Sequence, residues 1–222
     1  MKLKVTFIFF ALANLVFAGN PNSATGLNTA ENVSYLSPIE KEIIYEINLF
    51  RSNPAKYAEE FIAPLAVYYK NNILYYPNDQ QPVKTSEGVR ALNECVRELK
   101  KENPKPIIYP NEGLTRAATD HVNDQAKTGR TGHTGSDNSN LKNRVDRYGK
   151  WKIRIAENIA YGNTSARQVI IFLLIDDNVK NRGHRANLLN PDLKLVGVSF
   201  GRHPVYSTMC VMDFAGGMAN DN

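Results

Sequence analysis

The sequence predicts a single α+β domain, with helices early in the chain and strands late. Apolar residues recur at helical spacing through the first half of the chain. Two strand-like runs, 194–201 and 206–215, flank a turn that contains Gly201 and Pro204, which favours an antiparallel hairpin. Between the two halves, a helix is expected over 166–177, and its stretch 169–175 is apolar nearly all round, so we expect it to be buried.

The N-terminus has the features of a secretory signal peptide. Lys2 and Lys4 precede an uncharged, mostly apolar run over 5–18 that is too short for a comfortable membrane span. No later segment is long and apolar enough to span a bilayer, so we expect a secreted, extracellular protein without a transmembrane segment. The expected organisation is a signal peptide over 1–18, a flexible leader over 19–36, the domain over 37–217 and a tail over 218–222.

The charge is too mild to indicate a partner. Without Lys2 and Lys4, 25 basic residues (27 less 2) face 22 acidic ones, and the basic residues are scattered. Nucleic-acid binding would need a basic helix or arm, which the sequence lacks, so we expect no nucleic-acid partner. The basic residues over 144–154 are expected to form a solvated face.

The first half contains four expected helices. Ser37 is placed as an N-cap, with Pro38 at the first helical position and Glu40 in the first turn. Pro54 opens a second, short helix. The other expected segments are an irregular surface insert over 64–82, helices over 86–101 and 112–127, and a Gly-rich polar loop over 128–138.

The second half is expected to alternate between helix and strand. Ser165 with Gln168 three residues later forms a capping-box pattern before the apolar helix. The expected order is a short helix over 141–148, a strand over 153–161, the helix over 166–177, and strands over 194–201 and 206–215.

The two cysteines leave two alternatives open. Disulfides persist outside the cytoplasm, and a bond between Cys95 and Cys210 would close a loop over half of the chain. Cys95 lies in a helical pattern and Cys210 in an apolar strand-like run, which are also good places for two separate buried thiols.

Short motifs in a fixed order run through the chain. They are Asn48-Leu49-Phe50-Arg51, Gly132-His133, Ala156-Glu157-Asn158-Ile159-Ala160-Tyr161-Gly162, Gly183-His184-Arg185-Ala186-Asn187-Leu188-Leu189-Asn190-Pro191, Val196-Gly197-Val198 and Met212-Asp213-Phe214-Ala215-Gly216. Each motif alone is weak, but the ordered set resembles the CAP superfamily (cysteine-rich secretory proteins, antigen 5 and pathogenesis-related 1), especially microbial SCP-like extracellular domains. This resemblance implies a three-layer α-β-α sandwich with a central antiparallel sheet.

The resemblance also implies a cleft of two histidines and two acidic residues. Carried over by position, these are His133, Glu157 and His184, with Asp177 in the place where many members have a glutamate. Two imidazoles and a carboxylate from distant segments suit an open zinc site, with His133, His184 and Glu157 as ligands. The alternative is a hydrogen-bonded polar cluster that fixes loops onto helices.

Two functions remain open from the sequence. The first, which we favour, is a binding module whose cleft holds a divalent metal and whose groove binds a small hydrophobic ligand, a sterol, another lipid or a peptide. The second is a metal-assisted hydrolase that uses the same cleft, with Asp177 as the base. A Gly-x-Ser-x-Gly elbow and a His-Glu-x-x-His helix are both missing from the sequence, which argues against common catalytic classes.

Overall fold

The computed structural model describes residues 26–79 and 81–219. The expected signal peptide and the last three residues lie outside this part of the chain. Within the described ranges, none of the helices has the length and apolar character needed to cross a membrane. The helices are α1 (Pro38–Ser52), α2 (Pro54–Tyr57), the π-helical turn η2 (Ala58–Ile62), the 3-10 helix η3 (Ala63–Tyr68), α3 (Val89–Leu99), α4 (Glu112–Thr128), α5 (Leu141–Val145), α6 (Ala166–Ile175) and α7 (Gly183–Leu189).

The central sheet contains four strands in the order β4-β6-β7-β5. They are β4 (Tyr109–Pro110), β6 (Leu195–His203), β7 (Ser207–Ala219) and β5 (Lys150–Tyr161). β6 and β7 form the predicted antiparallel hairpin, and β5 adds to β7 in antiparallel register. The three predicted strands therefore share one sheet. β5, β6 and β7 form the expected antiparallel sheet. The two-residue strand β4 was not predicted, and it adds to β6 in parallel.

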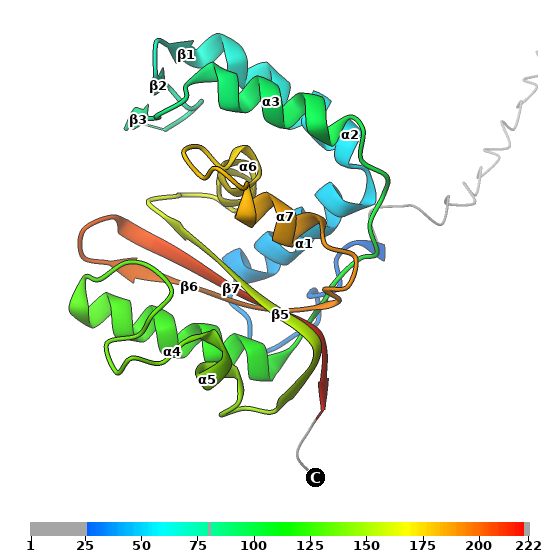
Figure 1. The fold of residues 1–222 in the computed structure, drawn as a ribbon, viewed down its shortest axis with the longest axis vertical. Helices are drawn as coiled ribbons and strands as arrows, with labels where there is room; N and C mark the ends of the chain where they lie inside the picture. The colour runs from blue at the N-terminus through cyan, green and yellow to red at the C-terminus, as the bar shows by residue number, and fades with distance from the viewer. Residues whose placement is uncertain (1–25, 80, 220–222) are drawn as a thin grey trace, which may run out of the picture.

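Helices cover both faces of this sheet, as the α-β-α prediction requires. Figure 1 shows α4 and α5 on one face and α1, α6 and α7 on the other, with α3 farther out beyond α6. Gly197 in β6 lets α4 approach closely, because a Cβ there would lie 2.0 Å from the backbone of Leu114 and Thr115. The predicted burial of α6 is confirmed: Val169, Ile170 and Leu174 are fully enclosed in the main core.

The expected irregular insert is more regular than predicted. It forms a small antiparallel sheet of β1 (Tyr69–Lys70), β2 (Ile73–Leu74) and β3 (Val83–Lys84) beside α3. Part of the expected flexible leader also packs on the domain, since Ala30 and Leu36 are buried in the main core. Strand β7 extends to Ala219, into the expected tail.

Two buried polar residues of the first motif hold distant loops against α1. The Asn48 side chain donates to the carbonyl of Ile108 (3.0 Å) and accepts from its N–H (2.7 Å). The Arg51 guanidinium donates to the carbonyls of Leu188 (2.9 Å) and Leu193 (3.1 Å), which follow the second histidine. This motif therefore positions the site without belonging to it.

The two cysteines do not form the disulfide that the sequence allowed. Cys95 in α3 and Cys210 in β7 are both free and buried, and both belong to the main hydrophobic core. Burial raises the pKa of the Cys95 thiol to about 12. The structure thus corresponds to the alternative of two separate thiols.

Candidate functional site

The edge strand β5 carries the centre of the site. Neighbouring residues of a strand point to opposite faces, so Glu157 and Asn158 face different layers. Glu157 lies on the face covered by α4 and α5. The Asn158 side chain donates to the carbonyl of His184 (3.1 Å) at the start of α7 and accepts from the Asn187 amide (2.9 Å). Because β5 is the outermost strand, loops from both layers can meet around this point.

On the first face, the Glu157 carboxylate contacts the imidazole of His133 and the guanidinium of Arg144. Its Oε1 lies 2.7 Å from His133 Nδ1, and its Oε2 accepts from Arg144 in α5 at 2.6 Å. Arg144 also donates to the carbonyls of His133 (3.1 Å) and Ser139 (3.2 Å). The Glu157 and Arg144 side chains are 3% and 2% exposed, whereas that of His133 is 58% exposed. His133 is therefore the solvent-facing end of a buried ion pair.

These contacts shift the pKa values of both partners. Burial alone would raise the pKa of Glu157, but the hydrogen bond from His133 and the charge of Arg144 outweigh it, so the pKa is lowered. The hydrogen bond to Glu157 raises the pKa of His133. The pair is thus held in its ionic form more firmly than two isolated groups would be.

Asp213 of β7 lies directly opposite Glu157 in the sheet. It is fully buried, and neither of its carboxyl oxygens makes a hydrogen bond of normal geometry within the described residues. Burial, reinforced by the nearby charge of Glu157, raises its pKa well above the usual range. The two neighbouring carboxyl groups therefore have pKa values that are shifted in opposite directions.

On the second face, His184 pairs with Asp176. Asp176 is the left-handed C-cap of α6 (φ 55°) and is 3% exposed. It accepts from the backbone N–H of His184 (2.9 Å), and its other oxygen lies 2.7 Å from His184 Nδ1. The carboxylate orients the imidazole with Nδ1 toward Asp176, which leaves Nε2 as the ring nitrogen available to a ligand.

The expectation that Asp177 is the second acid beside the histidines is corrected here. Asp177 accepts from the backbone N–H groups of Ser86 (2.6 Å) and Glu87 (2.8 Å), just before α3. The left-handed conformation of Asp176 turns the chain between the two residues, so the adjacent carboxylates face different elements. Asp176 takes the place beside His184, and Asp177 fixes the turn before α3 to the end of α6.

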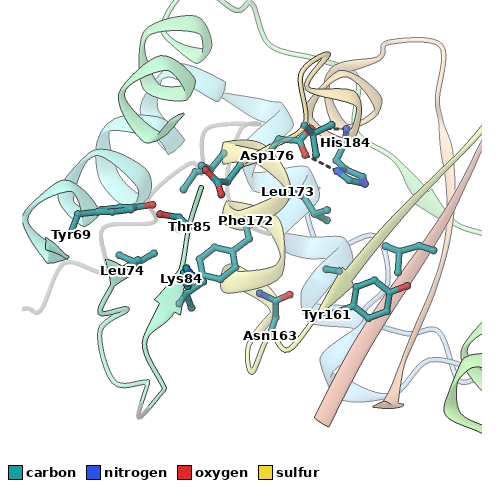
Figure 2. Close-up of a pocket in the computed structure, with 16 residues that line it drawn as sticks. Tyr69, Leu74, Lys84, Thr85, Tyr161, Asn163, Phe172, Leu173, Asp176 and His184 are labelled. Atoms are coloured by element: carbon teal, nitrogen blue, oxygen red, sulfur yellow. Dashed lines mark hydrogen bonds and ion pairs between the residues drawn. The ribbon is translucent and has the colours of Figure 1, made fainter. Parts of the chain in front are cut away.

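A pocket opens beside the second pair, between α6, the end of β5 and the small sheet. Its volume is about 230 Å³. Figure 2 shows Leu74 and Lys84 on the side of the insert, Phe172 and Leu173 on α6, and Tyr161 and Asn163 at the end of β5. Asp176, Asp177 and His184 also line it. The pocket thus combines an apolar wall with an oriented histidine.

One family model matches most of this chain. The model of the cysteine-rich secretory protein family (CAP) matches residues 44–214, which is more than half of the chain. The chain belongs to the CAP family. None of the curated proteins compared matches it.

Three solved structures are similar to this CAP domain. An extracellular SCP-domain protein of Bacillus anthracis has 22% identity, covers 50% of this chain and 34% of its own, and has a TM-score of 0.42. An outer surface protein of Borrelia burgdorferi has 18% identity and a TM-score of 0.42, and the match covers 60% of this chain and 95% of that protein. A cysteine-rich secretory protein of Staphylococcus aureus has 18% identity and a TM-score of 0.40, and the match covers 73% of this chain and 48% of that protein. The chain therefore spans about a third of the length of the first.

The shared zinc site expected from the sequence does not fit the side chains of this CAP domain. Both oxygens of Glu157 are engaged, one by His133 and one by the positive charge of Arg144. His184 turns its Nδ1 to a different carboxylate. Among residues 26–79 and 81–219, no three His, Cys, Asp or Glu side chains are placed to hold one metal ion. The four cleft residues form two histidine–carboxylate pairs.

Two residues of the candidate site, Arg144 and Asp213, were not predicted from the sequence. Arg144 was assigned to a solvated basic face, yet it is buried beneath Glu157. The signal that could have drawn attention to Asp213 was an acidic residue inside an otherwise apolar strand. No local pattern indicated the pocket, because its walls come from residues within 69–85 and 159–184, which meet only in the folded chain.

Proposed function

We propose that this protein is a secreted ligand-binding module of the CAP family, whose pocket takes the apolar part of a small molecule. The observation that carries the proposal is the pocket itself, with the apolar side chains of Leu74, Phe172 and Leu173 beside the His184–Asp176 pair. Ligand sites are typically concave and mostly apolar, with a few oriented polar groups. Secretion is supported by the signal-peptide pattern over 1–18, and the proposed domain is 37–217.

The size of the pocket narrows the class of ligand. A volume of about 230 Å³ lies below the roughly 300–1,000 Å³ of pockets that enclose drug-sized ligands. An engineered cavity of about 150 Å³ binds benzene. The pocket therefore suits one ring or a short aliphatic group better than a whole sterol, although a longer ligand can extend from its open side.

The hydrolase alternative gains no support from the geometry. It requires a metal shared by His133, Glu157 and His184, and Arg144 holds one oxygen of Glu157 at 2.6 Å. The His133–Glu157–Arg144 group instead ties the loop after α4 and helix α5 to the edge strand. We assign it the role of a support for the site.

A matched pair of substitutions tests the binding proposal. Val83 lines the pocket, so Val83→Phe should fill it, whereas Val205 lies 68% exposed at the β6–β7 turn and lines no part of it. Each protein would be purified, extracted with organic solvent and analysed by mass spectrometry, then titrated with single-ring apolar compounds and followed by NMR. Wild type and Val205→Phe should bind, and Val83→Phe should not. Equal binding by all three, or by none, would refute the proposal.

A further inference from the structure

Asn163 places an amide without a protein partner at the wall of the pocket. It follows β5 and Gly162, lines the pocket and is 3% exposed. Its Nδ2 is buried and makes no hydrogen bond to any described residue. Figure 2 shows this amide between Phe172 and Tyr161, with the nitrogen on the side of Phe172.

The surrounding structure holds Asn163 in place without using its amide nitrogen. The backbone carbonyl of Asn163 accepts from the Thr208 hydroxyl at 2.7 Å. The neighbouring Thr164 is held by Gln168, whose Oε1 accepts from its N–H at 2.6 Å. A buried donor without an acceptor costs about 1–3 kcal/mol, so native structures rarely retain one without a reason. An acceptor supplied by a ligand is such a reason.

The charges around the pocket indicate which acceptor it suits. Asp176 and Asp177 both line the pocket, together with Lys84 and the His184 imidazole, which already faces Asp176 at 2.7 Å. A ligand carboxylate would therefore meet two like charges within a partly desolvated space, and the imidazole beside them is already engaged by Asp176. A neutral carbonyl oxygen avoids this repulsion and still accepts a hydrogen bond.

We propose that the pocket binds a small uncharged carbonyl compound, with its oxygen accepting from Asn163 Nδ2 and a ring-sized apolar group against Leu74, Phe172 and Leu173. This inference rests on the proposed function, because it names the ligand class of the same pocket. A ring together with a short carbonyl group matches a volume of about 230 Å³.

Three probes of nearly equal size distinguish the contributions of the apolar ring, the neutral carbonyl oxygen and a negative charge to binding. Acetophenone has a ring and a neutral carbonyl, ethylbenzene lacks the oxygen, and benzoate carries a negative charge. Each would be titrated into the wild-type protein, and the affinity measured from NMR shifts of Leu74 and Leu173. Acetophenone should bind about three- to tenfold more tightly than ethylbenzene, the range expected for one neutral hydrogen bond. Benzoate should bind more weakly than acetophenone.

The Asn163→Leu variant tests the role of the amide directly. Leucine has a similar size and keeps the backbone carbonyl that Thr208 binds, and circular dichroism would check that the variant folds. Asn163→Ala serves as the second variant if leucine disturbs the fold. The substitution should abolish the preference for acetophenone while ethylbenzene binding is kept.

The possible failures are distinguishable. Equal affinity of the wild type for acetophenone and ethylbenzene, or a preference that survives in the variants, would overturn the carbonyl inference and leave the pocket proposal standing. Absence of binding by all three probes would overturn both.

Discussion

Replacing Arg144 by methionine should destabilise the protein far more than replacing any exposed arginine. Arg144 is 1% exposed and is the guanidinium that compensates the buried Glu157 carboxylate, with Nη2 2.6 Å from Oε2. Removing one partner of a buried ion pair leaves an uncompensated charge and typically costs about 3–5 kcal/mol. The residue opposite Glu157 in the sheet is Asp213, a carboxyl group, which cannot replace the positive charge of Arg144.

Arg147→Met is the matched control. Arg147 pairs with Asp120 (2.9 Å) and Asp137 (3.0 Å), but its side chain is 43% exposed, and exposed pairs typically contribute about 0–1 kcal/mol. The free energy of unfolding would be measured for both variants by urea denaturation near neutral pH. Adding Glu157→Gln to Arg144→Met should recover part of the loss, because it removes the stranded charge.

The refuting result is a small effect at the buried site. If Arg144→Met costs less than about 1 kcal/mol, as the exposed control should, then water or local rearrangement solvates Glu157 and the ion pair does not hold the edge strand to α5. If the double variant loses as much free energy of unfolding as Arg144→Met alone, the loss comes from the packing of the arginine stem and not from the stranded charge.

Three further predictions follow from the buried residues. Gly197→Ala should cost about 1–3 kcal/mol or more in urea unfolding, because its Cβ would lie 2.0 Å from the α4 backbone; Gly217→Ala, whose nearest neighbour lies at 3.7 Å, should be neutral or slightly stabilising, and similar losses would contradict the close approach. The pKa of Asp213 is raised in the folded protein, so its contribution to the free energy of unfolding falls as pH rises from the unfolded pKa of about 3.9 toward the folded pKa. Asp213→Asn should therefore increase the free energy of unfolding near pH 7 and leave it unchanged near pH 3, and a pH-independent effect would refute the raised pKa. Finally, Cys95 and Cys210 should resist a thiol reagent in the native protein and react as two thiols per chain after denaturation without reductant, whereas no reaction would show a disulfide.

Much of the architecture could be predicted because it depends on local patterns. Ser37 and Pro38 marked the start of α1, where the Ser37 N–H donates to Glu40 (2.7 Å). The apolar α6 and the β6–β7 hairpin were predicted because an apolar helical run and two strand-like runs around a turn are visible in consecutive residues. The predicted histidines and Glu157 also lie at the edge strand, each in contact with a carboxylate or an imidazole.

Contacts between segments that are distant in sequence decided three features that local patterns could not predict. β4 is two residues long and exists through its pairing with β6, far away in sequence. Arg144 looks like other basic residues of its segment, and its burial follows from the way α5 packs on β5. The choice of Asp176 over Asp177 depends on one left-handed backbone angle at the end of α6, which turns two adjacent carboxylates toward different elements.

The sequence by itself determined the longer helices α1, α3, α4 and α6, the main strands and the family, since periodicity, caps and motif order are properties of nearby residues. It did not indicate α7 or the 3-10 helix η3. The tertiary structure decided that the histidines form separate pairs, that the cysteines stay apart and that a pocket exists. These features depend on distances between segments that are far apart in the chain. Such distances are set by how α3, α6 and the small sheet pack together, and no run of consecutive residues encodes them.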